Sequence, residues 1–222
     1  MVIDTSKVTH IIFDWDGTIM DSAAKIVSCM QEAAASSNLP VPTTAQVEHI
    51  IGISLLPAIE KLFDVDSEKA KQVCKYYKDA FLRQDQISCA LFDGAYEVLA
   101  TLSKHYILGV ATGKARRGLA RAFANTSTEG YFDQSICGDE AESKPSPDML
   151  EQLLNRWDIE AHQALMIGDT IYDMQMAEQL FMPRIAVSYG VHDKQALVAH
   201  HPLAVIDKLS ELNAIFRLSG KS

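Results

Sequence analysis

The sequence has few cysteines, no long apolar run and no excess of positive charge, and each absence excludes a class of protein. Its four cysteines form no C-x-x-C pair of the kind that binds zinc or haem, so free buried thiols are expected. No stretch reaches the roughly 18 to 20 apolar residues that a membrane span needs, and the N-terminus lacks a secretory layout. Lys and Arg number 20 against 29 Asp and Glu, and the net charge of −9 disfavours nucleic acid and anionic lipid as partners. We therefore expect a cytoplasmic protein that binds neither nucleic acid nor membrane.

What the chain does contain is the composition of a folded globular protein. Its 222 residues are 48% hydrophobic and 22% charged, which suits one medium domain or two small ones. Short apolar runs predict strands at Val8–Phe13, Tyr106–Ala111, Ala164–Ile167, Arg184–Ser188 and, more weakly, Ala204–Ile206. Helical patterns lie between them, at Gly94–Lys104, Ala115–Ala124, Pro147–Arg156, Met174–Leu180 and Leu209–Leu218. This alternation predicts a doubly wound α/β fold, in which helices cover both faces of a parallel sheet.

The interval after the first strand breaks the alternation. Between residues 20 and 88 the patterns are helical only, at Asp21–Ser37, Thr44–Ile51, Leu55–Phe63 and Ser67–Gln84, with a turn at Pro40-Val41-Pro42. We interpret residues 20–88 as a small all-helical domain inserted into an α/β core made of residues 1–19 and 89–222.

Polar residues follow the predicted strands, where ligands bind in sheets of this kind. They are Asp14 and Asp16 after the first strand, Thr112 after the second, Asp169 and Asp173 after the third, and Lys144 in a Ser- and Pro-rich loop. Carboxylates that converge on one edge of a sheet repel each other unless a cation lies between them. Because oxygen ligands favour Mg²⁺ over zinc, we expect a magnesium site here.

These residue types suit an attack on phosphorus. With Mg²⁺ bound, Asp14 would stay ionised and act as a nucleophile, while Thr112, Gly113 and Lys144 would hold the oxygens of a phosphate. Asp16 would protonate the leaving oxygen and later take a proton from water, provided that its surroundings raise its pKa.

Each of these residues also has a purely structural explanation. The aspartates and Thr112 are common helix-capping residues, Asp173 suits the first turn of a helix, and a lysine before proline is usually solvated. The order of the set along the chain favours the functional interpretation. Lys114, Arg116 and Arg117 follow Thr112 and Gly113, and they either contact the substrate or form the exposed basic start of a helix.

Four short motifs appear in a fixed order, and they resemble those of the haloacid dehalogenase-like hydrolase superfamily. Within it, the chain is most similar to the phosphoglycolate phosphatase-like branch, whose members have a helical cap. The motifs are Phe13-Asp14-Trp15-Asp16-Gly17-Thr18, Ala111-Thr112-Gly113, Lys144-Pro145 and Gly168-Asp169-Thr170-Ile171-Tyr172-Asp173. The resemblance spans most of the chain.

The resemblance implies a role for each matching residue. Asp14 would become an aspartyl-phosphate, Asp16 would act as general acid and base, and Thr112 and Lys144 would bind phosphate. Mg²⁺ would be held by Asp14, the backbone carbonyl of Asp16 and Asp169, with Asp173 supporting its waters and Lys144. The helical insert corresponds to the cap, in which Gly52-Ile53-Ser54-Leu55 resembles a loop that closes over the substrate, so Gly52 and Ser54 are candidate substrate contacts.

We therefore expect a Mg²⁺-dependent phosphomonoesterase, a monomer or weak homodimer, that acts on a small phosphorylated metabolite. A phosphoglycolate-like acid, a sugar phosphate or a nucleotide would fit. A sugar phosphomutase of the β-phosphoglucomutase type remains an alternative, because it uses the same motifs and passes the phosphoryl group to a sugar. A phosphoacceptor signalling module or a catalytically silent binding relative is the alternative from another class. Signalling receivers are much shorter and lack the helical insert.

Overall fold

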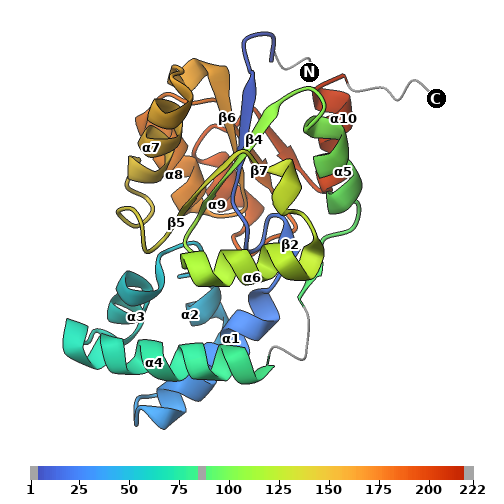
Figure 1. Ribbon diagram of the computed structural model, residues 1–222. Coiled ribbons are helices and arrows are strands. Elements are labelled where there is room, and N and C mark those ends of the chain that lie inside the picture. Colours follow the sequence, from blue (N-terminus) through green and yellow to red (C-terminus); the bar gives the residue numbers. More distant parts are fainter. Residues whose placement is uncertain (1–4, 85–88, 218–222) are drawn as a thin grey trace.

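A six-stranded parallel sheet forms the centre of the molecule, in the order β5-β4-β1-β6-β7-β8, with helices on both faces (Figure 1). The structure is a computed structural model that describes residues 5–84 and 89–217. The strands are β1 (His10–Phe13), β4 (Ile107–Thr112), β5 (Gln134–Cys137), β6 (Ala164–Gly168), β7 (Arg184–Val187) and β8 (Ala204–Ile206). The predicted doubly wound α/β fold is confirmed.

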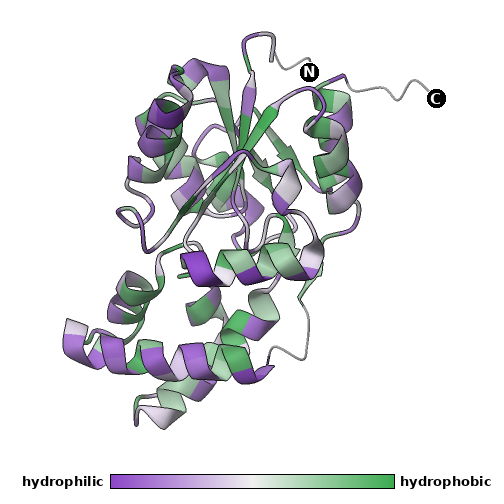
Figure 2. Ribbon diagram, viewed as in Figure 1, coloured by the Kyte–Doolittle hydropathy of each residue, from purple (hydrophilic) through white to green (hydrophobic). Residues whose placement is uncertain are grey.

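Alternate residues of the central strand pack on opposite faces of the sheet, as the period of an extended chain requires. Ile11 and Phe13 of β1 join one apolar core, whereas Ile12 between them joins another. The first core includes residues of α5 (Ala95–Leu102), α6 (Arg116–Thr126) and α10 (Leu212–Ile215), and the second includes residues of α7 (Asp148–Trp157) and α8 (Ile171–Gln179). Figure 2 shows the result, with a hydrophobic sheet inside and mixed helix surfaces outside.

Between the first two strands of the parallel sheet the chain forms a separate group of helices, which lies below the sheet in Figure 1. These are α1 (Ala23–Ser36), α2 (Thr44–Glu48), α3 (Leu55–Phe63) and α4 (Ser67–Arg83). The chain enters this group through β2 (Met20–Asp21) and returns through β3 (Ala90–Leu91), which pair antiparallel. The group has an apolar core of its own. We call residues 20–84 the helical insert. Its four predicted helices are present, but the interval is not helical only: Asp21, predicted to begin the first helix, lies in β2, and the second helix ends at Glu48 instead of Ile51.

Some elements differ from those predicted. The sequence pattern did not indicate β5 or the short helix α9 (Lys194–Val198). The last predicted helix consists of a 3₁₀ turn, Leu209–Glu211, followed by α10. Further 3₁₀ turns lie at Glu129–Tyr131 and Ala161–Gln163. Leu218 of that helix, and residues 1–4, 85–88 and 219–222 of the predicted domains, lie outside the described residues.

In the described ranges, every helix is too short or too polar to cross a membrane.

Candidate active site

The candidate site residues lie at the carboxyl edge of the central strands. Asp14 follows β1, Thr112 is the last residue of the neighbouring strand β4, and Asp169 follows β6 on the other side. Strand β1 lies between β4 and β6, so the strand order reverses direction at β1. In α/β sheets of this kind, ligands bind in the crevice at the carboxyl ends of the strands where the order reverses. The fold therefore brings together residues that are more than 150 positions apart in the sequence.

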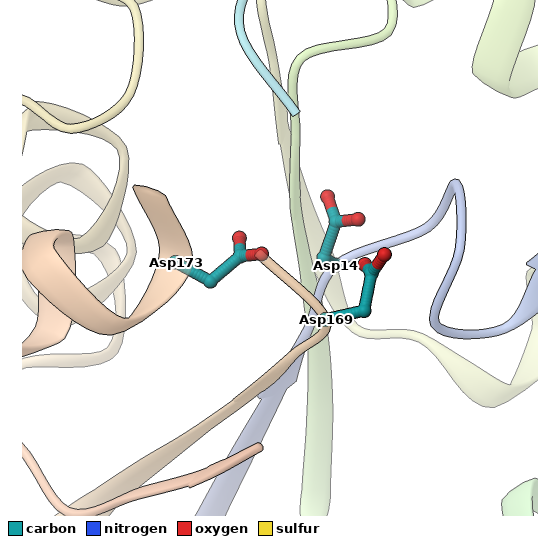
Figure 3. Close-up of side chains that lie close together, drawn as sticks. All are labelled: Asp14, Asp169 and Asp173. Atoms are coloured by element: carbon teal, nitrogen blue, oxygen red, sulfur yellow. The ribbon is translucent and has the colours of Figure 1, made fainter. Parts of the chain in front are cut away.

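Three carboxylates from different segments face a common space (Figure 3). Asp14, Asp169 and Asp173 each offer an oxygen, and these oxygens lie within 4.8 Å of one another. All three residues are buried. Asp14 Oδ2 has no hydrogen-bond partner among the described residues, although it is inaccessible to solvent. A buried carboxylate oxygen without a partner is costly, and it marks a place for a cation or a ligand.

Lys144 lies beneath this cluster with only 1% of its surface exposed. Its ammonium group donates hydrogen bonds of 2.6 Å to Asp14 Oδ1 and of 2.6 Å to Asp173 Oδ1. Burial opposes the charge on Lys144, but the two carboxylates outweigh it and raise the pKa of the lysine. The solvated position that is usual for a lysine before proline is therefore not what the structure shows.

One lysine does not balance three aspartates, so the cluster carries a formal charge of −2 when all four groups are ionised. Burial, reinforced by Asp173 and Asp169 against the opposing effect of Lys144, raises the pKa of Asp14 well above its usual value. Burial and then Asp173 likewise raise the pKa of Asp169 to about 7. Both shifts reflect first the burial of the charged carboxylates and then their mutual repulsion, and a bound divalent cation would oppose both effects.

The donor set fits magnesium. The three groups that could bind an ion are all carboxylates, and the net charge of −2 that they have together with Lys144 equals in size the charge of a divalent ion. Asp169 is held in place by the Thr18 hydroxyl, which donates to Oδ1 at 2.9 Å, and by the Val191 amide, which donates to Oδ2 at 2.9 Å. Each oxygen of Asp169 keeps a lone pair that can bind an ion, so these two hydrogen bonds orient the carboxylate and leave it able to act as a metal ligand.

Gly17 allows the first motif to pass close to Asp169. Its φ of +86° is in the left-handed region, and a Cβ atom there would lie 2.2 Å from Asp169 Oδ2. Only glycine meets both conditions.

Asp173 has two structural tasks. Its Oδ2 accepts hydrogen bonds from the amide and the hydroxyl of Thr170, which caps α8, and its Oδ1 accepts from Lys144. The capping interpretation and the site interpretation therefore both apply, through different oxygens of one carboxylate.

The carboxylate of Asp16 is not part of the three-carboxylate cluster. Its side chain accepts a 2.6 Å hydrogen bond from the Ser22 hydroxyl and pairs with Lys114 at 3.0 Å. The cluster contains no oxygen of this carboxylate, so a contact of Asp16 with a metal would have to come from its backbone carbonyl, as the resemblance implies. Sequence reasoning left the role of Lys114 open; the structure makes it the ionic partner of Asp16.

Thr112 and Gly113 share a cavity with Asp14. All three line a cavity of about 370 Å³ that extends between the sheet edge and the helical insert. The Thr112 hydroxyl accepts a hydrogen bond of 3.2 Å from the Lys114 amide, which leaves its hydrogen available to an acceptor in the cavity. A Cβ on Gly113 would lie 2.5 Å from the Gly52 carbonyl oxygen, so the insert loop rests directly on this turn.

The two candidate contacts of the insert loop differ in position. Gly52 lines the cavity, whereas Ser54 is absent from the described lining. The Ser54 amide donates to Ser143 Oγ at 2.9 Å, and a Cβ on Gly138 would lie 2.7 Å from the Ser54 hydroxyl oxygen. Ser54 therefore joins the loop to the core instead of facing the cavity.

The basic residues after Thr112 also differ in whether they line the cavity. Arg116 turns away and pairs with Glu140, while Arg117 and Arg121 line the cavity. Arg121 was not among the predicted site residues, although its position four residues after Arg117 places both on one face of α6.

A second missed residue is Tyr172, between the two aspartates of the last motif. Its hydroxyl donates to the His49 carbonyl oxygen at 2.8 Å and accepts from Lys61 at 3.1 Å, so it connects α8 to the helical insert.

Comparison with known proteins identifies the family. The family model described as haloacid dehalogenase-like hydrolase matches residues 11–187. The chain belongs to this family. It is 31% identical over 220 residues to a probable phosphatase, IndB, of Dickeya dadantii, covering 95% of this chain and 96% of that protein. It is 30% identical over 212 residues to a 5'-nucleotidase of Pseudomonas aeruginosa, covering 93% and 94%.

Solved structures share the fold of this haloacid dehalogenase-like hydrolase. A predicted phosphatase from Clostridium acetobutylicum superposes with a TM-score of 0.86 at 24% identity, covering 96% of this chain and 99% of that one. The predicted family and the expectation of an enzyme are both confirmed.

Proposed function

We propose that the protein is a Mg²⁺-dependent phosphomonoesterase that acts through an aspartyl-phosphate on Asp14. The observation that carries this proposal is the state of the Asp14 carboxylate. One oxygen is held by Lys144, the other is buried without a partner, and the residue lines the large cavity of the site. Relatives named as phosphatase and 5'-nucleotidase support the same chemistry.

Asp14, Asp169 and the Asp16 carbonyl would hold the ion, and Asp173 would orient Lys144 and the water ligands. The bound ion would neutralise charge on the carboxylates and on the phosphoryl group. Thr112, Gly113 and Lys144 bind the phosphoryl oxygens.

Two steps complete the reaction. An Asp14 oxygen forms a bond to phosphorus as the bond from phosphorus to the ester oxygen breaks, and Asp16, which must enter this step in its protonated form, gives its proton to the departing alkoxide. Asp16 then takes a proton from water, whose oxygen bonds to phosphorus as the aspartyl-phosphate bond breaks, which releases phosphate and restores Asp14. Ser22 and Lys114 position the Asp16 carboxylate for both transfers.

We further propose that residues 20–88 are a cap on a core of residues 1–19 and 89–222, which encloses a small phosphorylated metabolite. Two contacts support this assignment: the Gly52 loop lies against Gly113, and Tyr172 joins the core to the insert.

Phosphate release from a panel of phosphomonoesters tests the proposal. We expect release that needs Mg²⁺, stops with EDTA and is lost in Asp14→Asn, since an amide is a poor nucleophile. The matched control is Asp79→Asn, an exposed aspartate on α4, which should retain full activity. Failure of the wild-type protein to hydrolyse any ester, or full activity of Asp14→Asn, would contradict the proposal.

A further inference from the structure

The cavity beside Asp14 is much larger than a phosphate group. It has a volume of about 370 Å³, and its lining includes Asp14, Thr112 and Gly113 at the sheet edge and side chains of α1, α3, α4 and α6. A substrate whose phosphorus is within reach of Asp14 therefore places its leaving group in this cavity. The side chains that line this cavity therefore determine which leaving groups fit.

The wall that the helical insert contributes is apolar. Its lining side chains include Ile26 and Met30 of α1, Leu55 of α3, and Phe81 and Leu82 of α4. Helical spacing explains the arrangement, since residues four apart share a face of a helix. Only two polar side chains belong to the described part of this wall, those of Tyr77 and Lys78.

Phe81 is the aromatic side chain of this wall with the most ring contacts among the described residues. The Tyr77 ring lies 5.9 Å from its ring, and the ammonium groups of Lys25 and Lys114 lie 4.3 and 5.2 Å from its centroid. Such contacts between a cation and an aromatic face are attractive, so the ring is held in place before any ligand binds. Lys114 also pairs with Asp16, which links the apolar wall to the group that we propose protonates the leaving oxygen.

The side of the cavity that α6 and the loop before it form carries positive charge. Lys114, Arg117 and Arg121 approach it from α6 and the preceding loop, next to the sheet edge where the phosphoryl group binds. This side suits the dianion of a phosphate ester, and the insert side suits the rest of the molecule. A two-carbon acid would leave most of the apolar wall uncovered.

We propose that the preferred substrate is a phosphomonoester whose leaving alcohol carries an apolar body of at least the size of a phenyl ring, packed on Phe81 and its neighbours. This inference rests on the proposed phosphatase function and specifies its substrate class. Each additional methylene that becomes buried on this wall should raise kcat/KM by roughly fourfold.

A homologous series of phosphate esters tests the inference. Ethyl, butyl, hexyl and 2-phenylethyl phosphate have primary alcohols of similar basicity as leaving groups, so differences in kcat/KM report the fit of the body. We expect kcat/KM to rise by at least about tenfold from ethyl to hexyl and 2-phenylethyl phosphate, with phosphoglycolate at the low end.

Matched phenylalanine variants locate the effect. Phe81→Ala should reduce the ratio of kcat/KM for 2-phenylethyl phosphate to that for ethyl phosphate about tenfold. Phe181→Ala removes the same side chain from a position that is 91% exposed on the core, and it should leave the ratio unchanged. Should Phe81→Ala fail to fold, the wild-type series still decides the question.

The outcomes separate the two proposals. A flat series, or a preference for phosphoglycolate, would overturn the assignment of an apolar leaving group while the phosphatase function stands. Absence of hydrolysis across the whole series, phosphoglycolate, sugar phosphates and nucleotides would refute the phosphatase function itself.

Discussion

Replacement of Lys144 by methionine tests the electrostatic balance of the site. The lysine is buried, and its ammonium group is the cation that bonds to Asp14 and Asp173. Methionine keeps a side chain of similar length without the charge. In the absence of metal, the variant leaves three buried carboxylates with a formal charge of −3 in place of −2.

The expected loss is large compared with the stability of a domain. Removal of one partner from a buried ion pair costs about 3–5 kcal/mol, because the other partner stays buried without compensation. Folded domains are stable by about 5–15 kcal/mol in total. We therefore expect a lower midpoint of urea unfolding at pH 7.5 in EDTA, with an unchanged m-value, and loss of phosphatase activity.

The loss should depend on pH in a defined direction. Burial and the neighbouring aspartates raise the pKa of Asp14 and Asp169, and a pKa that is raised by folding destabilises the protein as pH rises through it. Without Lys144 these shifts increase, so the defect should be greatest at pH 7.5 and smaller at pH 5, where the carboxylates bind protons.

Lys71→Met is the matched control, because Lys71 also pairs with a carboxylate, Glu68, but on the exposed surface of α4. Surface ion pairs contribute little, so the urea midpoint of this variant should stay close to that of the wild type. Equal stability of Lys144→Met and Lys71→Met at pH 7.5 would refute the interpretation of the cluster as a site with an unbalanced negative charge.

Two further predictions concern the metal. Gly17→Ala should lower Mg²⁺ affinity and activity at least about tenfold and destabilise the fold by about 1–3 kcal/mol, because the added Cβ would displace Asp169. The control is Gly130→Ala, in which the added Cβ meets open space, so Mg²⁺ affinity, activity and stability should all stay unchanged. Titration calorimetry and urea unfolding measure both effects. Since the pKa of Asp169 is about 7 without metal, the folded state holds a proton that Mg²⁺ must displace, so Mg²⁺ should raise Tm more at pH 8 than at pH 5.5. An equal increase at both pH values would contradict this linkage.

Hydrophobic pattern predicted most of the fold, because each central strand is buried on both faces and is therefore apolar along its length. The bounds of strands β1, β4 and β6 agree with the predicted bounds to within two residues. Strand β5 was not predicted, because the rule for buried central strands does not apply to it. It lies at the edge of the sheet, and two of its four residues, Gln134 and Ser135, are polar.

The positions of the site residues followed from the rule that ligands bind at the carboxyl ends of parallel strands. Their partners did not, because those contacts join segments far apart in the sequence. The pairing of Lys114 with Asp16 and the burial of Lys144 between two aspartates depend on loop conformations that local sequence does not specify. Ser54 shows the opposite case, in which a residue of a predicted substrate loop lies against the core.

The most direct test of the account is to identify the residue that carries the phosphoryl group. Acid quenching during turnover, followed by borohydride reduction, converts an aspartyl-phosphate to homoserine, which peptide mass mapping locates in the chain. The account predicts homoserine at position 14 in the wild-type protein only when Mg²⁺ and a hydrolysed ester are both present. Homoserine at another aspartate, or its absence at position 14 during rapid turnover, would contradict the assignment of Asp14 as the nucleophile.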